Sequence, residues 1–143
     1  LWCAWTRRTL LSADEIVVVA APDLAGLRNT KNIYDLLKQG RANDHLPRVV
    51  LNQVGLPKRP EIAAGEFSKA LGTELAATIP FDAQLFGTAA NNGQMIAEVQ
   101  PSGKIAESFV DLASALTGRA EPRKARSTLL DPILSRFSRR KAS

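Results

Sequence analysis

Polar or conformationally restricted residues stand at the ends of three short apolar segments of the sequence. They are Asp23 after residues 15–21, Asn52 within residues 48–53, and Pro80, Phe81 and Asp82 at the end of residues 76–80. Asparagine is a poor strand residue, so the amide that follows "RVVL" calls for an explanation. One interpretation is a turn, because Asn and Gly commonly end strands and Gly55 lies just beyond. The other interpretation is a contact with a ligand.

The apolar segments alternate with stretches of helical periodicity. Helices are predicted over residues 2–12, 23–39, 60–72, 82–90 and 102–118, with Pro60 in a first turn and Asp82 and Ser102 as caps. This alternation predicts an α/β fold, the C-terminal half of a doubly wound, Rossmann-like parallel sheet in three α/β/α layers. "IVVVA" and "RVVL" do not alternate apolar with polar residues, so we expect both faces of the sheet to be buried.

The position of the polar residues in such a sheet favours a ligand site. Ligands of open parallel sheets bind outside the carboxyl ends of the strands. Because Asp23, Asn52 and Asp82 all stand at such ends, we expect them in one layer. Ordinary loop and capping chemistry is the alternative explanation for each of the three residues.

The chain is interpreted as a C-terminal fragment. Only three strands are predicted, whereas a doubly wound sheet usually has about five or more. The chain begins at Leu1 and its only methionine is Met95, so we expect the missing strands to precede Leu1. Trp2 and Trp5 lie three residues apart in the first predicted helix and are expected to pack in the core or at an interface.

Several kinds of chemistry are excluded by what the 143 residues contain. No GxxxxGK[ST] motif is present, since Gly103-Lys104 is followed by Ile105. The single Cys3 and single His45 build neither a disulfide framework nor a metal cluster, and no nucleophile, base and acid stand in a triad pattern. We therefore predict no catalytic and no metal-binding residue, and an inactive chain on its own.

The positive charge is concentrated at one end of the chain. Residues 119–143 carry eight basic and two acidic side chains, a net charge of +6, whereas the remaining 118 residues carry 11 basic and 12 acidic ones. We therefore divide the chain into a nearly neutral domain, residues 1–118, and a basic linker with a short amphipathic tail, residues 119–143.

The tail combines apolar anchors with cations. The residues in question are Ile133, Leu134, Arg136, Phe137, Arg139 and Arg140. Such a short amphipathic helix suits an anionic membrane surface, where each cation contributes about 1 kcal/mol. The alternatives are a protein partner, a solvated tail and, least favoured, the phosphates of a nucleic acid.

Three stretches of the sequence resemble a known family. "LWCAWTRRTLLSADEIVVVAAPDLAGLRNTKNIYDLL", "PRVVLNQVGLPKRPEI" and "IPFDAQLFGTAANNGQMI" are similar to the C-terminal half of MinD/ParA-type P-loop ATPases. "LNQVG…KRPEI" and "IPFD…FGTAANNGQ" resemble more closely the CpaE/TadZ branch that serves Flp (Tad) pilus assembly. The resemblance covers roughly residues 1–118. A receiver domain, another doubly wound fold, needs an acidic cluster on its first strand that is not seen here.

The resemblance implies roles for individual residues. Asn52 matches the family asparagine whose amide reads the adenine edge, and Pro80, Phe81 and Asp82 match the segment that wraps the same base. Asp23 stands where relatives place a glutamate near the ATP-dependent dimer interface, and the shorter side chain departs from that pattern. The family's phosphate-binding loop and its acidic switch residues would lie before Leu1.

The resemblance also implies a function for the full-length protein. It implies a MinD/ParA-class ATPase that organises the assembly or localisation of Flp pili, forms a homodimer and binds ATP and Mg²⁺, neither of which is expected in this fragment. The implied partners are the pilus secretion machinery and, through the tail, an anionic membrane. The implied location is the bacterial cytoplasm, peripherally at the inner membrane or the cell pole. The alternative is a non-catalytic polar scaffold that recruits pilus secretion components.

Overall fold

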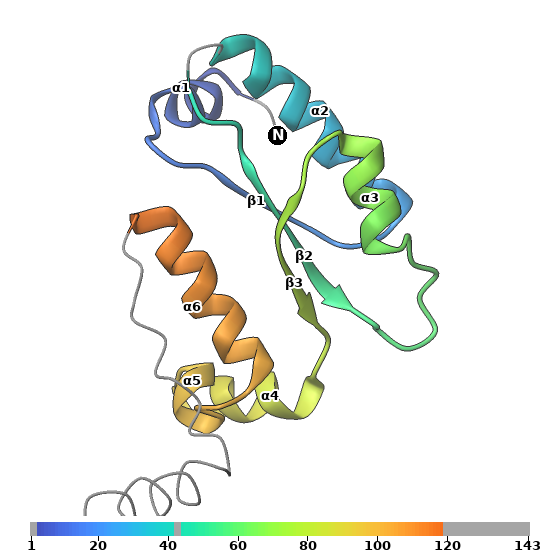
Figure 1. Ribbon diagram of the computed structural model, residues 1–143, viewed down its shortest axis with the longest axis vertical. Coiled ribbons are helices and arrows are strands. Elements are labelled where there is room, and N and C mark those ends of the chain that lie inside the picture. Colours follow the sequence, from blue (N-terminus) through green and yellow to red (C-terminus); the bar gives the residue numbers. More distant parts are fainter. Residues whose placement is uncertain (1–2, 42–43, 119–143) are drawn as a thin grey trace, which may run out of the picture.

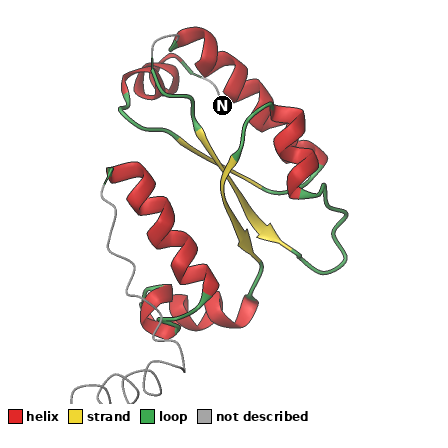
Figure 2. Cartoon of the chain, in the orientation of Figure 1, coloured by secondary structure: helices red, strands yellow, loops and turns green. Residues whose placement is uncertain are grey.

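A computed structural model describes residues 3–41 and 44–118 of the chain. Its elements are α1 (Ala4–Ser12), β1 (Val17–Ala20), α2 (Leu24–Gly40), β2 (Arg48–Val54), α3 (Ala64–Leu71), β3 (Leu75–Pro80), α4 (Ala83–Asn92), α5 (Ile96–Val99) and α6 (Lys104–Thr117). Figures 1 and 2 show their arrangement. The predictions made for Trp2 and for Ile133, Leu134, Arg136, Phe137, Arg139 and Arg140 lie outside the described residues.

The three strands form one parallel sheet in the order β1-β2-β3, with β2 in the centre. Parallel neighbours need a crossover connection, and α2 and α3 supply the two crossovers. These two helices pack on one face of the sheet, and α4, α5 and α6 pack on the other (Figure 1). The predicted α/β fold, with a parallel sheet between two helical layers, is therefore confirmed.

Strand β2 contributes to the apolar core on both faces of the sheet. One core comprises Ala20, Tyr34, Val49, Leu51, Phe67 and Leu71. The other comprises Val50, Ile79, Leu85 and Ile105. Val49, Val50 and Leu51 are each at most 1% exposed, so the burial of β2 on both faces, predicted from its continuous apolar run, is confirmed.

The start of α3 differs from the prediction. The helix begins at Ala64, four residues later than Pro60. In the intervening stretch the backbone N–H of Ile62 donates to the carbonyl oxygen of Pro22, and the Glu61 carboxylate accepts from the backbone N–H groups of Gly55 and Leu56. These bonds hold the stretch as a loop. The predicted end of the helix is confirmed.

One further prediction about the helices was wrong, and one short helix was missed. The residue at the N-cap of α6 is Gly103 rather than Ser102, and no side chain caps this helix. The short helix α5 was not predicted, because four residues are too few to show helical periodicity. Its first turn is held by the Glu98 carboxylate, which accepts from the backbone N–H of Met95 at 2.8 Å.

Two side chains expected to be buried are exposed. Val19 of β1 is 60% exposed, whereas Val17, on the same face of the strand, packs against the core of Val50, Ile79, Leu85 and Ile105. Trp5 is 76% exposed, so it does not pack in the core of this chain, and its place at an interface stays a prediction. No residue of α1 is buried, and this helix approaches α2 where Leu11 meets Gly40.

Gly26 allows a close approach between α2 and the chain that precedes it. A Cβ atom at this position would lie 2.2 Å from the carbonyl oxygen of Ala21, a backbone atom that cannot move away independently. The backbone conformation of the first turn of α2 therefore requires glycine at residue 26.

We expect Gly26→Ala to lower the free energy of unfolding by about 1–3 kcal/mol, because the methyl group overlaps backbone. Gly87→Ala is the matched control: it also lies in a helix, and nothing lies within 4 Å of its ideal Cβ. That control should raise the free energy of unfolding by about 0.5–1 kcal/mol through helix propensity. Urea unfolding followed by circular dichroism measures both, and equal shifts would contradict the steric argument.

Candidate functional site

A pocket of about 230 Å³ lies at the carboxyl ends of β2 and β3 and at the start of α4. It is lined by Asn52, Gln53, Pro80, Phe81, Asp82, Ala83 and Phe86. Pockets that enclose a whole drug-sized ligand have volumes of about 300–1,000 Å³, so this pocket has room for one ring system rather than a whole nucleotide. The structure thus brings together all four residues that the sequence assigned to a base.

The chemistry of the lining suits a flat heteroaromatic ring. Phe81 is 38% exposed, and Phe86, which is partly buried, lines the same pocket. Asn52 and Gln53 supply amide groups at the same pocket. Apolar faces that stack on a ring, combined with a few polar groups that meet its edge, are the common composition of such sites.

A β-bulge brings Asn52 to the pocket. Asn52 and Gln53 together stand opposite the single residue Ile79, because the register of β2 against β3 shifts between Leu51 and Val54. Bulges bend a strand and redirect its side chains, and they recur next to binding sites. Gln53 has a φ angle of +58°, which costs a residue other than glycine about 1–2 kcal/mol.

The Asn52 amide is oriented by its neighbour. Its Oδ1 accepts a hydrogen bond from the backbone N–H of Gln53 at 2.9 Å. Within residues 3–41 and 44–118, no group accepts a hydrogen bond from the Asn52 Nδ2. Asn52 therefore has the local role of a strand-end residue and also keeps a donor for a ligand, so the two interpretations of the sequence are compatible.

Asp82 caps α4 from the edge of the same pocket. Its Oδ1 accepts a hydrogen bond from the backbone N–H of Leu85 at 2.8 Å, which confirms the predicted cap. The capping bond engages one carboxylate oxygen, and the second oxygen has no partner among the described residues. A contact between Asp82 and a base stays a prediction.

Asp23 caps α2 and lies apart from the pocket. Its Oδ1 accepts a hydrogen bond from the backbone N–H of Gly26 at 2.7 Å. It follows β1, which is separated from β3 by the central strand, and it does not line the pocket. The structure therefore gives Asp23 a capping role, while its role at a dimer interface stays a prediction.

A charged pair that the sequence analysis did not single out organises the loop beside the pocket. Arg59 donates to the side-chain and backbone oxygens of Gln53, and it forms an ion pair of 2.9 Å with Glu61. The backbone N–H of Gly55 and the Arg59 guanidinium hold the pKa of the Glu61 carboxyl below its usual range. Ionised Glu61 therefore holds the loop at neutral pH, and this contribution is lost only as the pH falls through the lowered pKa.

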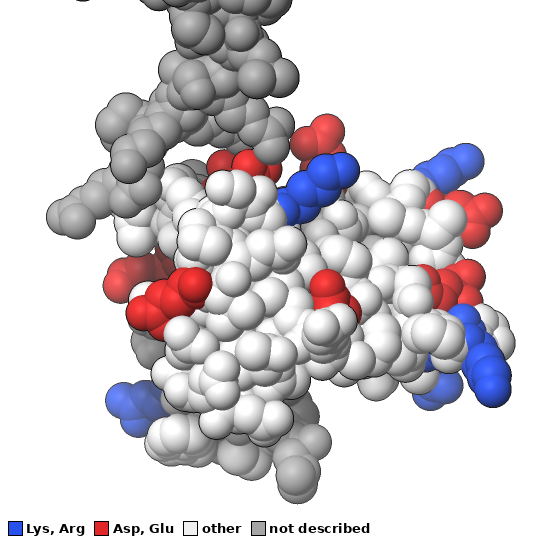
Figure 3. Space-filling model, turned by 90° about the horizontal axis from the view of Figure 1, so that it is seen from below, with Lys and Arg blue, Asp and Glu red and all other residues white. Residues whose placement is uncertain are grey.

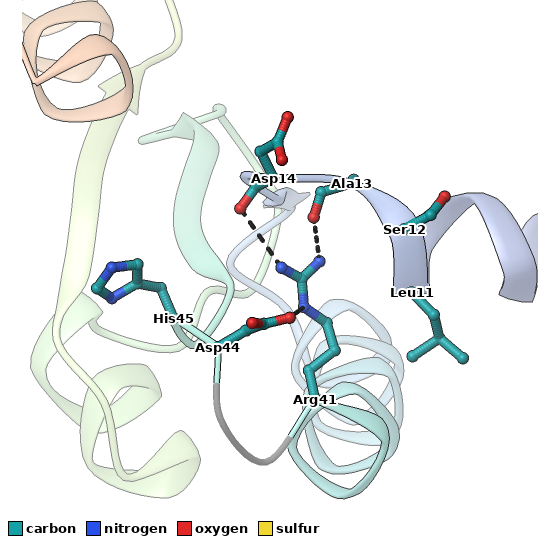
Figure 4. Close-up of a pocket in the computed structure, with 7 residues that line it drawn as sticks. All are labelled: Leu11, Ser12, Ala13, Asp14, Arg41, Asp44 and His45. Atoms are coloured by element: carbon teal, nitrogen blue, oxygen red, sulfur yellow. Dashed lines mark hydrogen bonds and ion pairs between the residues drawn. The ribbon is translucent and has the colours of Figure 1, made fainter.

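A second, larger pocket surrounds Arg41 at the opposite ends of the strands. Its volume is about 440 Å³, and its lining comprises Leu11, Ser12, Ala13, Asp14, Arg41, Asp44 and His45 (Figure 4). The Arg41 side chain is 5% exposed and forms an ion pair of 3.2 Å with Asp44. Its guanidinium also donates to the carbonyl oxygens of Leu10, Ala13 and Asp14, so it ties the end of α1 to the end of α2.

The role of Arg41 was missed by the sequence analysis. A basic residue at the end of a helix is a recognisable signal, since such side chains satisfy free carbonyl groups. The carbonyl groups concerned lie 27 to 31 residues away in the sequence, however, and only the fold brings them together.

The surface of the described part carries scattered charge. Figure 3 views the molecule from the end that bears α4 and α5, where uncharged surface predominates and basic side chains lie toward the margin. In the described ranges, no three His, Cys, Asp or Glu side chains are grouped so that they could hold a metal ion. None of the described helices is long and apolar enough to cross a bilayer.

Solved structures with a similar arrangement include MinD and ParA ATPases. The MinD cell division ATPase of Pyrococcus furiosus is 27% identical with a TM-score of 0.62, and the match covers 77% of this chain and 45% of that one. The ParA family ATPase of Chlorobium tepidum is 25% identical with a TM-score of 0.59, over 76% and 43% of the two chains. The chain has the fold of the MinD and ParA ATPases. A scan of protein-family models and a search of curated sequences found no match.

The chain spans less than half the length of these MinD/ParA structures. A third structure, the septum site-determining protein MinD of Pyrococcus horikoshii, was solved as a complex with Mg-ADP. It is 25% identical with a TM-score of 0.62, over 74% of this chain and 42% of that one. The resemblance to the MinD/ParA superfamily is thus confirmed, and the narrower resemblance to the pilus branch stays a prediction.

We expect Arg41→Met to lower the free energy of unfolding by about 1–3 kcal/mol, because carbonyl groups at the end of α1 lose their donors. The control is Arg28→Met, which removes the same charge from an exposed position of α2. Thermal unfolding of both variants provides the comparison. A loss in Arg28→Met as large as that in Arg41→Met would show that charge, rather than the link between helices, is responsible.

We expect Asp82→Ala to lower the free energy of unfolding by about 1 kcal/mol through loss of the helix cap. Asp82→Ser should retain most of the stability, because a serine hydroxyl caps the same N–H without carrying a charge. Chemical denaturation of the two variants checks this prediction. If the serine variant is as unstable as the alanine variant, the carboxylate has a stabilising role beyond the cap.

Proposed function

We propose that the pocket between β2, β3 and α4 binds the adenine base of ATP. The observation that carries this proposal is the meeting of Asn52, Pro80, Phe81 and Asp82 in one pocket at the carboxyl ends of parallel strands. Further support comes from the fold that the chain shares with a MinD protein solved with Mg-ADP. In this assignment the amide of Asn52 meets the polar edge of the base and Phe81 covers its face.

The pocket fits the base and not the rest of the nucleotide. Its volume is that of a single ring system, and its lining contains one acidic residue, Asp82, and no basic one. Phosphates need clustered N–H donors or cations, and Mg²⁺ needs oxygen ligands. The phosphates and Mg²⁺ would therefore be held by groups that do not line this pocket. Bound ATP would supply the energy of phosphate transfer, while the residues that line the pocket orient its base.

The same proposal gives the chain its place in a larger protein. Residues 1–118 are the C-terminal part of a MinD/ParA-type ATPase domain, and residues 119–143 are a basic linker and amphipathic tail. The full-length protein is a homodimer, with Asp23 near its interface, and resides in the bacterial cytoplasm at the inner membrane or cell pole. Its tail contacts an anionic membrane or a pilus secretion component.

For the cellular role we propose the organisation of Flp (Tad) pilus machinery. The support is the resemblance of "LNQVG…KRPEI" and "IPFD…FGTAANNGQ" to the CpaE/TadZ branch. A non-catalytic scaffold is the second candidate, and its support is the same resemblance, because that branch includes proteins whose phosphate-binding loops have degenerated. ATP hydrolysis by the purified full-length protein separates the ATPase from the scaffold.

We expect Asn52→Ala to weaken ATP binding by about three- to tenfold in the protein at its full natural length. The reason is the loss of one hydrogen bond to the base, which contributes about 0.5–1.5 kcal/mol. Isothermal titration calorimetry with ATP measures the dissociation constant directly.

Asn29→Ala is the matched control for this experiment. Asn29 is exposed on α2, so the same substitution there removes an amide that does not line the pocket. Its ATP affinity should equal that of the wild type. An unchanged affinity in Asn52→Ala, with the domain still folded, would refute the adenine assignment.

A further inference from the structure

Arg59 and Glu61 form a clamp around the end of β2. The Arg59 guanidinium donates to the backbone oxygen of Gln53 and, at 3.3 Å, to its Oε1. Glu61 accepts from the same guanidinium at 2.9 Å and from the backbone N–H groups of Gly55 and Leu56 at 2.9 and 3.2 Å. The two residues of this ion pair thus fix Gln53, the second residue of the bulge, and Gly55 and Leu56, where the following loop starts.

The clamp is connected to the pocket through Gln53. Glu61 forms an ion pair with the Arg59 guanidinium, and this guanidinium donates a hydrogen bond to the backbone oxygen of Gln53. The backbone N–H of Gln53 in turn donates to the Asn52 Oδ1 at 2.9 Å. Gln53 and Asn52 both line the pocket, whereas Arg59 and Glu61 do not. The two charged residues therefore act on the pocket through Gln53, whose backbone oxygen and side-chain Oε1 both accept from Arg59.

The conformation that the clamp holds is unfavourable by itself. Gln53 lies in the left-handed region at φ +58°, where side chains other than glycine are disfavoured. The side chains of Arg59 and Glu61 are only 18% and 21% exposed, and the Arg59 Nε is buried without a hydrogen-bond partner among the described residues. Such strained positions persist where the surrounding contacts determine them, and they cluster at ligand sites.

We propose that Arg59 and Glu61 are positioning residues, which hold the Asn52–Gln53 bulge in the conformation that presents the Asn52 amide to a purine base. The base-binding part of this inference rests on the proposed function. The positioning part rests on the contacts alone, because they exist without a ligand. The pocket is therefore pre-organised, and loss of the clamp reduces affinity by freeing the amide rather than by removing a contact with the base.

The test compares Arg59→Met with Lys58→Met. Lys58 is the adjacent residue in the same loop, is exposed and also has a positive φ, so the control removes an equal charge without touching the clamp. The first measurement is hydrogen exchange of the Gln53 backbone amide by NMR in the 143-residue chain without nucleotide. The second is the dissociation constant for ADP in the protein at its full natural length.

We expect Arg59→Met to accelerate exchange at Gln53 by at least tenfold and to weaken ADP binding by about fivefold or more, with neither change in Lys58→Met. Arg59→Lys should recover little, because an ammonium group cannot contact Gln53 and Glu61 in the fork-like geometry of a guanidinium. Exchange equal to that of the wild type would overturn the positioning role. In a wild-type protein that binds ADP, faster exchange in Arg59→Met with unchanged ADP affinity would overturn the inferred effect of the clamp on base binding. A wild-type protein that binds no ADP would refute the proposed function, while faster exchange in Arg59→Met would still support the positioning.

Discussion

The burial of β2 on both faces is the constraint on which the rest of the structure depends. Val49 and Leu51 enter one core and Val50 enters the other, and burial of each such side chain contributes about 1.5–3 kcal/mol. A slip of one residue would exchange the faces and place these side chains in the wrong cores. The register of the sheet is thereby fixed, and with it the point at which β2 emerges from the core. That point is Asn52, at the edge where parallel sheets bind ligands.

Residues at the strand ends combine structural and ligand chemistry because each carries more than one polar atom. Asp82 uses one carboxylate oxygen to cap α4, and Asn52 uses its Oδ1 to hold Gln53. In each case a second polar atom of a pocket-lining residue has no partner among the described residues. A structural explanation of such a residue therefore does not compete with a functional one. The hydrogen bond that each side chain makes also restricts its rotation, and restricted side chains suit a binding site.

Features that depend on periodicity were predictable, and features that depend on distant partners were not. The continuous apolar run of β2 and the helical spacing of α2 are properties of adjacent residues, so both elements were predicted. The four predicted pocket residues could be placed in one layer because parallel strands share a carboxyl edge. The exposure of Val19 depends on which helices cover it, and the links made by Arg41 span up to 31 residues of sequence. Nor does any propensity indicate that the strand would bulge at Asn52.

Two arginines with little-exposed side chains show how the sequence separation of the bonded groups distinguishes a contact that fixes the fold from a contact that shapes a site. Arg41 bonds groups 27 to 31 residues away, so its bonds close long loops and hold two helices together. Arg59 bonds only residues two to six positions away, which are near neighbours even in an unfolded chain. Such short-range bonds contribute little to the arrangement of helices and strands, but they stabilise one local backbone conformation over others. The conformation that they stabilise here is the disfavoured one at Gln53, within the bulge whose residues Asn52 and Gln53 line the pocket.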